Sequence, residues 1–438
     1  MKKLVYPIVF SLLGIHLLVA QSPSLEQEAA NAYPDYLFEA TKVMVHDVIS
    51  PPAAARYYAY ACLAGYLADK VHSNSNPPDF TQKLNGYRPI DYRPKPKSNA
   101  SLASTYAMLD VARQMLPSGE SLTKVLDQLA MEYRNKYKLS KREISSSIES
   151  AKSVSSYVMA YAKGDHFNEL SAKMGYTPKP GPGYWYPTPP AYMAAIEPNW
   201  QTLRTFFLDS PTQFIPLKPT PFDMDPNSDF YQKELMVVYE AVKNVTPEQE
   251  VIANFWDCNP FNVQMTGHMA IGFKKITPGG HWMGIAGIAC KKEGYGMKQT
   301  TATLALVALT LHDAFVSCWD EKYRSERIRP ETVINQHLDQ NWRPILQTPP
   351  FPEYTSGHSV VSGAASVILT AIFGEPYKFT DDTEIIFGLP ERDFTSFEAA
   401  AQEAAISRLY GGIHYMDACT NGIVQGKAVG AFIRDKVF

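Results

Sequence analysis

The sequence has few cysteines and no long run of positive charge. Its five cysteines are scattered over 438 residues, and none forms a CxxC pair. An odd number of scattered thiols indicates neither a disulfide scaffold nor a zinc site, and small buried side chains are the better interpretation. The formal net charge is −3 and there is no basic stripe. Nucleic acids and anionic membrane surfaces are therefore poor candidates as partners.

Long apolar runs are also scarce. Beyond the N-terminus, the most apolar segment is Thr301–Trp319, and His312 and Asp313 interrupt it. Because charged residues on a bilayer-facing helix are costly, this segment is predicted to be a buried core helix. The hydrophobic content of 45% is normal for a soluble globular protein.

The first residues, MKKLVYPIVFSLLGIHLLVAQ, have two lysines, an apolar stretch and then Ala20 at a suitable cleavage point. This pattern predicts a signal peptide over residues 1–20 and an exported, periplasmic or secreted protein. The alternative is a permanent membrane anchor, although the stretch is short for a span of about 20 residues. We expect no membrane attachment once the signal is removed.

Helical spacing of apolar residues dominates the rest of the chain. It predicts an N-terminal helical region over residues 21–175 and a C-terminal catalytic helical bundle over 230–438. Residues 176–229 are dense in proline and predict a connecting segment that wraps over the helices. No strand-rich segment or repeat stands out. The predicted fold is all-α, with two helical halves. The clearest predicted helices are 53–69, 102–115, 141–163, 230–244, 247–256, 297–325, 356–373, 397–410 and 423–438, with Thr246 as an N-cap.

Three short C-terminal segments have residue types that suit an oxyanion. The first, DEKYRSERIRP, contains Lys322 and Arg329 seven residues apart, so on a helix both side chains can point the same way. Pro330 biases Arg329 out of helical geometry and places it at a helix end. Taken alone, the segment also describes a solvated charged face.

The second segment runs through Ser356, Gly357 and His358 into the apolar stretch VVSGAASVILTAIF. A Ser-Gly-His step at a helix start offers a hydroxyl, free backbone N–H groups and an imidazole, which together make an anion site. The alternative is an N-cap serine followed by a surface histidine. The prolines and aromatics of PPFPEY, which constrain the approach to this turn, favour the anion site.

The third segment, SRLYGGIHYMD, places Arg408 and His414 on either side of a Gly-Gly pair, which permits a sharp turn or a close backbone approach. Asp417, three residues after His414, is a candidate to accept the second ring proton and fix the tautomer. A glycine-rich helix end with a surface arginine and histidine is the alternative.

Together the segments supply three cations, a hydroxyl, a backbone amide and two histidines, which suits a compact, multiply charged oxyanion. Their order, K-x6-RP, then SGH, then SR-x5-H, resembles the vanadium-dependent haloperoxidase and type 2 phosphatidic acid phosphatase superfamily. The resemblance extends from Lys322 to Asp417, and it implies a catalytic helical bundle of the acid phosphatase and vanadium haloperoxidase type.

The resemblance also implies roles for individual residues. Lys322, Arg329 and Arg408 would neutralise the equatorial oxygens, and Ser356 and the N–H of Gly357 would donate hydrogen bonds to them. His358 would be the acid–base residue. His414 would bond to the central atom, which is vanadium in a haloperoxidase and phosphorus in a phosphatase. Two positions depart from the family pattern: Thr355 replaces a proline before the Ser-Gly-His step, and Asp417 comes three residues after His414 rather than four.

The choice between the two activities depends on the surrounding residues, because vanadate takes the shape of a phosphoryl group in transfer. Phe351 lies where chloroperoxidase-type members carry a phenylalanine, and it favours a haloperoxidase with a halide pocket. That reading implies a vanadate cofactor, with hydrogen peroxide and a halide, iodide or bromide, as substrates. Met416 argues against it, because hypohalous acid oxidises thioethers. An acid phosphatase with a phosphohistidine intermediate and a non-catalytic oxyanion binder stay open. Further residues that either line a halide pocket or pack in loops are Trp256, His268, His281 and Trp282.

Overall fold

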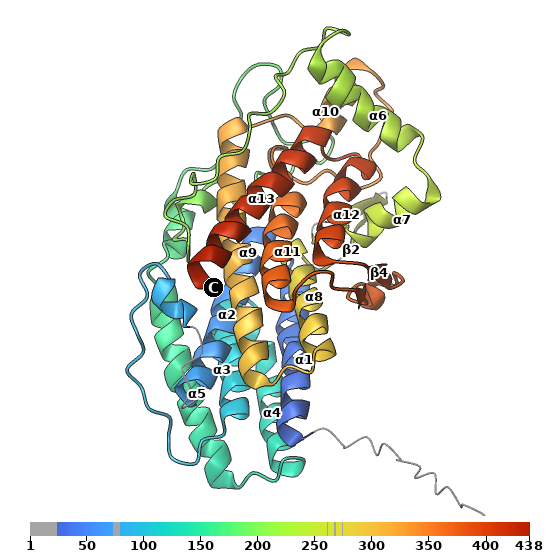
Figure 1. The fold of residues 1–438 in the computed structure, drawn as a ribbon. Helices are drawn as coiled ribbons and strands as arrows, with labels where there is room; N and C mark the ends of the chain where they lie inside the picture. Colours follow the sequence, from blue (N-terminus) through green and yellow to red (C-terminus); the bar gives the residue numbers. More distant parts are fainter. Residues whose placement is uncertain (1–23, 73–78, 261, 267–268, 274) are drawn as a thin grey trace, which may run out of the picture.

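The computed structural model describes residues 24–72, 79–260, 262–266, 269–273 and 275–438. These residues form thirteen α-helices and two short antiparallel hairpins (Figure 1). The predicted all-α fold is confirmed. The predicted signal peptide, residues 1–20, lies outside the described residues, and the proposed boundaries at 175, 229 and 230 stay predictions.

The N-terminal helices form one end of an elongated molecule (Figure 1). Local capping explains several of their starts: the side chain of Asn99 accepts the N–H of Leu102, and Ser140 with Glu143 forms a reciprocal capping box. The helices are α1 (Leu25–His46), α2 (Pro51–His72), α3 (Ala100–Met115), α4 (Thr123–Asn135) and α5 (Lys141–Ala162). Nearly every residue of α2 is buried, because α3, α5 and α9 pack around it.

The C-terminal bundle begins with a π-helical turn at Phe230–Leu235. Its helices are α6 (Met236–Lys243), α7 (Pro247–Phe255), α8 (Pro278–Lys292), α9 (Met297–Ser325), α10 (Pro330–His337), α11 (Gly357–Phe373), α12 (Phe397–Tyr410) and α13 (Met416–Val437). Thr246 caps α7 as predicted, in a capping box with Gln249. Helix α13 begins seven residues earlier than the predicted 423, because Thr420, Asn421 and Gly422 are weak helix formers that hide the periodicity.

Two hairpins were not predicted. Strands β1 (Asn262–Thr266) and β2 (Met269–Phe273) pair with each other, as do β3 (Phe379–Asp381) and β4 (Arg392–Phe394). Strands of three to five residues are too short to show an alternating pattern that differs from chance.

Helix α9 runs along the length of the molecule and packs against α2 in one half and α11 and α13 in the other (Figure 1). Among the described residues it is the one helix long and apolar enough to cross a membrane, and 94% of its most apolar window is buried inside the protein. The predicted core helix is confirmed. The charged residue Asp313 is tolerated inside this apolar helix because its carboxylate accepts three backbone N–H groups, from Phe206 (2.7 Å), Phe207 (2.7 Å) and Leu208 (3.1 Å).

The proline-rich residues 176–229 have little regular structure and hydrogen-bond to the loops around α9 and α11. The N–H of Trp185 donates to the carbonyl of Glu326 (2.6 Å), and the N–H of Ile328 donates to Gly183 (2.9 Å). The N–H of Ile196 donates to Pro350 (3.1 Å). This segment therefore supports the two loops that carry the oxyanion motifs.

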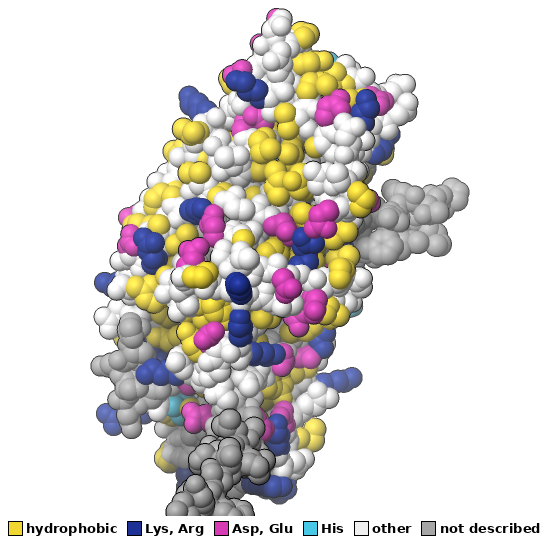
Figure 2. Space-filling model, turned by 45° about the vertical axis from the view of Figure 1, so that its right-hand side comes forward, with side chains coloured by type: hydrophobic (Ala, Val, Ile, Leu, Met, Phe, Trp, Pro, Cys, Tyr) yellow, Lys and Arg dark blue, Asp and Glu magenta, His cyan; other side chains and the backbone are white. Residues whose placement is uncertain are grey.

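On the face drawn in Figure 2, basic and acidic side chains alternate over the surface, with apolar side chains between them. No basic stripe is seen among the described residues on this face, in agreement with the sequence.

Candidate active site

Lys322 lies in the last turn of α9 and is fully buried. Its Nζ donates to the carbonyls of Pro352 (3.0 Å), Glu353 (3.0 Å) and Thr355 (2.6 Å). Burial lowers the pKa of Lys322 to about 7. Lys322 therefore fixes the loop before α11 and brings a poorly solvated positive charge to the site.

Arg329 does not continue the helix of Lys322. Helix α9 ends at Ser325, Glu326 adopts a left-handed conformation (φ 49°), and Arg329 is the extended residue before α10. The prediction that the two side chains share a helix face is wrong, although the predicted effect of Pro330 is confirmed. The guanidinium nevertheless reaches the same loops. Its Nε donates to Phe351 O (2.9 Å) and its Nη1 to Ile413 O (2.8 Å).

Nη1 of Arg329 also lies 3.2 Å from Nε2 of His414. Burial lowers the pKa of Arg329 to about 10, which is still high enough to keep its charge at neutral pH. A permanent positive charge therefore lies next to the second histidine of the motif.

Ser356, Gly357 and His358 form the start of α11, as predicted. Ser356 is the N-cap: its Oγ accepts the N–H of Ser359 (3.3 Å), and its own N–H donates to Ala418 O (3.1 Å). Gly357 and His358 are the first two residues of the helix, so their N–H groups have no acceptor within it. These amides and the positive end of the helix dipole attract an anion.

The ring of His358 has a free nitrogen. Its Nε2 is buried and has no hydrogen-bond partner among the described residues. Burial, with the charges of Arg408 and His414, lowers the pKa of His358 well below its ordinary value. His358 is therefore neutral at physiological pH and has an available proton acceptor.

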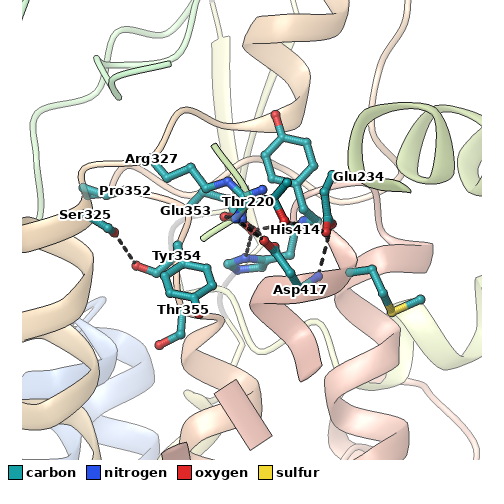
Figure 3. Close-up of polar contacts among 12 residues, drawn as sticks. Thr220, Glu234, Ser325, Arg327, Pro352, Glu353, Tyr354, Thr355, His414 and Asp417 are labelled. Atoms are coloured by element: carbon teal, nitrogen blue, oxygen red, sulfur yellow. Dashed lines mark hydrogen bonds and ion pairs between the residues drawn. The ribbon is translucent and has the colours of Figure 1, made fainter. Parts of the chain in front are cut away.

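His414 lies in the turn between α12 and α13, and its Nδ1 is 2.8 Å from Oε1 of Glu353 (Figure 3). The same Oε1 accepts the N–H of Tyr415 (3.0 Å). Burial and the cations Arg329, Lys322 and Arg408 lower the pKa of His414 well below its ordinary value. Glu353 accepts a hydrogen bond from the Nδ1 proton of the neutral ring. Nε2 therefore keeps its lone pair and is the nitrogen that can bind a central atom.

Asp417 does not orient His414, and this expectation is corrected. Its carboxylate pairs with Arg327 and accepts the N–H of Thr220 (2.9 Å), while its own N–H donates to Glu234 (3.1 Å) (Figure 3). The expectation assumed that His414 and Asp417 share a helix, but α13 begins at Met416, after His414. Arg327 also lies 3.5 Å from Glu353, so Asp417 acts one layer further from the ring.

Arg408 comes from the last turn of α12 and is buried. Its Nη2 donates to Ala253 O at the end of α7 (3.1 Å), and its Nε donates to Ser407 Oγ (3.0 Å). The Gly-Gly pair after it makes the predicted sharp turn. Gly412 has φ +77°, and a Cβ on Gly411 would lie 2.6 Å from the side chain of Leu346.

These groups meet at one cavity, whose lining includes Gly357, His358, Arg408, His414, Phe351 and Trp319. The rings of Phe351 and Trp319 lie 5.1 Å apart and form an apolar wall. Lys322 and Arg329 lie behind that wall, with the Lys322 Nζ 5.1 Å from the Phe351 ring. Ser356 likewise lies outside the lining. The structure thus places Gly357, His358, Arg408, His414 and Phe351 on the cavity, with Asp417 in an outer layer.

The other expected pocket residues belong to the packing around the cavity. Trp256 stacks on His281 with ring centroids 4.5 Å apart, and Trp282 donates to Ser362 Oγ (2.8 Å). His268 lies outside the described side chains. Met416 packs in an apolar cluster with Phe230 and does not line the cavity, which removes the objection to a haloperoxidase.

The chemistry of the donor set fits a multiply charged oxyanion such as vanadate. Burial lowers the pKa of Lys322, Arg329 and Arg408, so each cation is poorly compensated until an anion is added. The free Nε2 of His358 and the helix-start amides face the same cavity. Glu353 and Arg327 were missed from sequence, because nothing in PPFPEYTSGH marks Glu353 as a partner of a residue 61 positions away.

Comparisons with known proteins identify the fold and the family. Residues 302–438 match the family model described as the VCPO second helical-bundle domain. No curated protein matches the chain. Two solved structures, of a holo-type and an apo-type bacterial vanadium-dependent chloroperoxidase, are each 14% identical, with TM-scores of 0.64 and 0.62. The matches cover 89% and 88% of this chain, and 92% and 93% of the chloroperoxidase chains, and show the same fold.

A further solved structure, described as that of the first bacterial vanadium-dependent iodoperoxidase, superposes with a TM-score of 0.86. It is 41% identical, and the match covers 95% of this chain and 98% of the other. With this identity over nearly the full length of both chains, the protein belongs to the bacterial vanadium-dependent haloperoxidase family.

Proposed function

We propose that this enzyme oxidises iodide with hydrogen peroxide at a vanadate held in the cavity, and that bromide is its second substrate. The observation that carries the proposal is the pairing of Glu353 with Nδ1 of His414, which leaves Nε2 as the ligand atom beside buried cations. Iodide and bromide are favoured over chloride because they are easier to oxidise. The solved iodoperoxidase supports iodide in particular.

The residues that would hold vanadate each contribute a different interaction. Lys322, Arg329 and Arg408 would balance its charge, and Ser356 and the N–H of Gly357 would donate hydrogen bonds. Nε2 of His414 would bond to vanadium. When bound, vanadate supplies a Lewis acid that activates hydrogen peroxide without a change in its own oxidation state.

His358 is the residue that moves protons in this proposal. Its neutral ring and unbonded Nε2 allow it to accept a proton from incoming hydrogen peroxide and return it to the departing product. Phe351 and Trp319 limit water next to Lys322, which strengthens each charge in the cavity. We assign Phe351 to the halide side of the cavity.

The direct test is to load the purified chain with orthovanadate and measure peroxide-dependent oxidation of iodide, bromide and chloride. Hydrolysis of a phosphate monoester is measured on the same preparation without vanadate. We expect iodide oxidation that depends on vanadate and disappears in His414→Ala. Ester hydrolysis that vanadate blocks, with no halide oxidation, would instead identify a phosphatase. Tight vanadate binding with neither activity would identify an oxyanion binder.

We also propose that the protein is exported and that residues 1–20 are removed. The basis is the sequence pattern of two lysines, an apolar stretch and Ala20. N-terminal sequencing of the protein from fractionated cells tests it. A mature chain that begins at residue 21 in the periplasm or medium is expected, and an intact N-terminus in the membrane fraction contradicts it.

A further inference from the structure

A second cluster of buried polar side chains lies next to the cavity. It consists of Cys258 after α7, His281 in the first turn of α8, and Glu384 after β3. All three are buried, and one ligand atom from each lies within 4.8 Å of the other two. Cys258 itself lines the active-site cavity. The proposed haloperoxidase reaction gives none of these residues a role.

The distances within the cluster suit one small metal ion. Sγ of Cys258 lies 3.4 Å from Nδ1 of His281, and Oε1 of Glu384 lies 3.3 Å from the same Nδ1. Thiolate, imidazole and carboxylate ligands at normal zinc bond lengths in a tetrahedron are about 3.3 to 3.6 Å apart. Both distances to Nδ1 are therefore those of neighbouring ligands of a tetrahedral ion, and the sulfur and the carboxylate oxygen lie within 4.8 Å of each other.

Glu384 provides independent support. Its side chain is 1% exposed, and neither carboxylate oxygen has a hydrogen-bond partner among the described residues. A buried carboxylate without donors is costly unless it is protonated or bound to a cation. The ion-pair contact of Glu384 is with Nδ1 of His281 (3.3 Å), the nitrogen that would bind the metal, while Nζ of Lys275 is bonded to Asp257 (3.1 Å). A dication with one thiolate and one carboxylate would leave the cluster neutral.

The far side of the imidazole is arranged as in metal sites. Nε2 of His281 lies 2.7 Å from Oδ2 of Asp381. The other oxygen of Asp381 accepts both the N–H (3.1 Å) and the hydroxyl (2.6 Å) of Thr383. When the ring is neutral, a carboxylate that accepts a hydrogen bond from the Nε2 proton leaves Nδ1 with its lone pair and fixes the ring towards a metal. The stacked ring of Trp256 holds the same orientation.

We propose that Cys258, His281 and Glu384 bind a zinc ion beside the vanadate cavity, with Asp381 as the residue that orients His281. Thiolate, imidazole and carboxylate are together a ligand set that zinc prefers. The ion joins three segments that are distant in sequence: the end of α7, the start of α8 and the β3–β4 hairpin. It thereby holds the stretch that contributes Cys258 to the cavity wall.

The test uses the full chain, purified without chelator after growth with zinc and then dialysed against metal-free buffer. Elemental analysis is expected to find about one zinc per chain. Replacement of zinc by cobalt is expected to give the near-ultraviolet absorption of a cobalt–thiolate bond and the visible bands of a tetrahedral ion. A wild-type chain with neither zinc nor these bands would show that the cluster is a hydrogen-bonded network only.

Matched variants locate the ion. Cys258→Ala is expected to lose zinc and the thiolate band. The control is Cys290→Ala, which removes a buried thiol of α8 outside the cluster and is expected to keep both. Glu384→Gln tests the carboxylate without a change in size. Asp381→Asn should lower zinc affinity by roughly 10- to 100-fold. Circular dichroism checks that each variant folds.

Two results separate this site from the vanadate site. His414→Ala should keep zinc while it loses vanadate, and Cys290→Ala should keep both zinc and vanadate. Zinc that survives in Cys258→Ala and Glu384→Gln, or that disappears equally in Cys290→Ala, would overturn the assignment. Zinc should also raise the melting temperature of the wild type but not of Cys258→Ala, because a ligand that binds the folded state stabilises it.

Discussion

Oε1 of Glu353 lies 2.8 Å from Nδ1 of His414 and fixes which ring nitrogen is available to the cavity. Behind this pair, Arg327 contacts both Glu353 and Asp417. The contacts form a series from Asp417 to Arg327, Glu353 and His414 (Figure 3). Asp417, Arg327 and Glu353 alternate in charge, so each of them holds the next, and Glu353 in turn orients the neutral ring of His414. Burial raises the pKa of Glu353, and the charges of Arg327, Arg329 and Lys322 offset only part of that rise.

The first prediction concerns Glu353→Gln. The glutamine amide keeps the size of the side chain but removes the charge that fixes the Nδ1 proton. We expect vanadate affinity, measured by isothermal titration calorimetry, to fall by roughly 10- to 100-fold. Asp417→Asn is the control, because that carboxylate reaches His414 through Arg327 and Glu353 only. An equal loss in the control would mean that the series acts by general stability and not by the ring orientation.

The second prediction separates the two histidines of the motif. His358→Ala should keep vanadate binding, because Nε2 of His358 is free and not a ligand in this assignment. Its kcat for iodide oxidation should fall by roughly 100-fold or more, the usual contribution of a general acid–base residue. His414→Ala should lose vanadate binding itself. Calorimetry and steady-state kinetics on both variants check this, and loss of vanadate by His358→Ala would contradict the role of that residue.

The third prediction is a pH dependence due to Lys322. Burial lowers the pKa of Lys322 from 10.5 to about 7, so its free amine dominates above that pH in the empty cavity. Bound vanadate favours the protonated amine and raises this pKa, so binding takes up a proton as the pH rises above 7. The contribution of Lys322 to affinity is therefore fully present below pH 7 and decreases above it.

The measurement for Lys322 compares the wild type with Lys322→Met across this pH range, since vanadate titrates in both. The ratio of their affinities should be largest below pH 7 and should decrease above it. Calorimetry in buffers with different ionisation enthalpies should show more proton uptake by the wild type. A ratio that does not change with pH would mean that Lys322 keeps its charge throughout.

The fourth prediction concerns the assignment of Phe351 to the halide side. Phe351→Leu keeps an apolar side chain but loses the ring that packs on Trp319 and covers the Lys322 ammonium. We expect the KM for iodide to change several-fold while vanadate affinity changes little. Phe315→Leu is the control, because that ring also lines the cavity and packs on Trp319. A loss confined to vanadate affinity would place Phe351 at the cofactor and not at the halide.

The sequence predicted most of the helices, because they depend on local patterns, and the residues proposed for the oxyanion site lie in or next to one cavity. Apolar periodicity located α2, α3, α9 and α12 closely, and a helix start at Ser-Gly-His fixes Ser356 and His358 in place. Contacts between segments that are distant in the sequence could not be predicted from such patterns. Glu353 with His414 and Cys258 with His281 are made by the tertiary fold, with no motif spacing to reveal them.

The Cys258 cluster shows that local sequence patterns can also argue against a site that the tertiary fold assembles. The absence of a CxxC pair argued against a zinc site, yet its proposed ligands come from three separate segments. The misplaced roles have a common cause. Asp417 and the shared face of Lys322 and Arg329 were inferred by continuing a helix through residues where the structure turns.

The last prediction concerns Asp313, the buried carboxylate within the apolar helix α9. Asp313→Ala should leave the N–H groups of Phe206, Phe207 and Leu208 without their acceptor, at a position too buried for water to replace it. A single buried donor left unpaired costs about 1–3 kcal/mol, so we expect the unfolding free energy to fall by about 3 kcal/mol or more. Chemical unfolding at a fixed pH measures it. Asp320→Ala on the same helix is the control, since its pairing with the half-exposed Arg324 contributes at most about 1 kcal/mol. If the two variants unfold at the same denaturant concentration, Asp313 does not anchor residues 206–208 to the core.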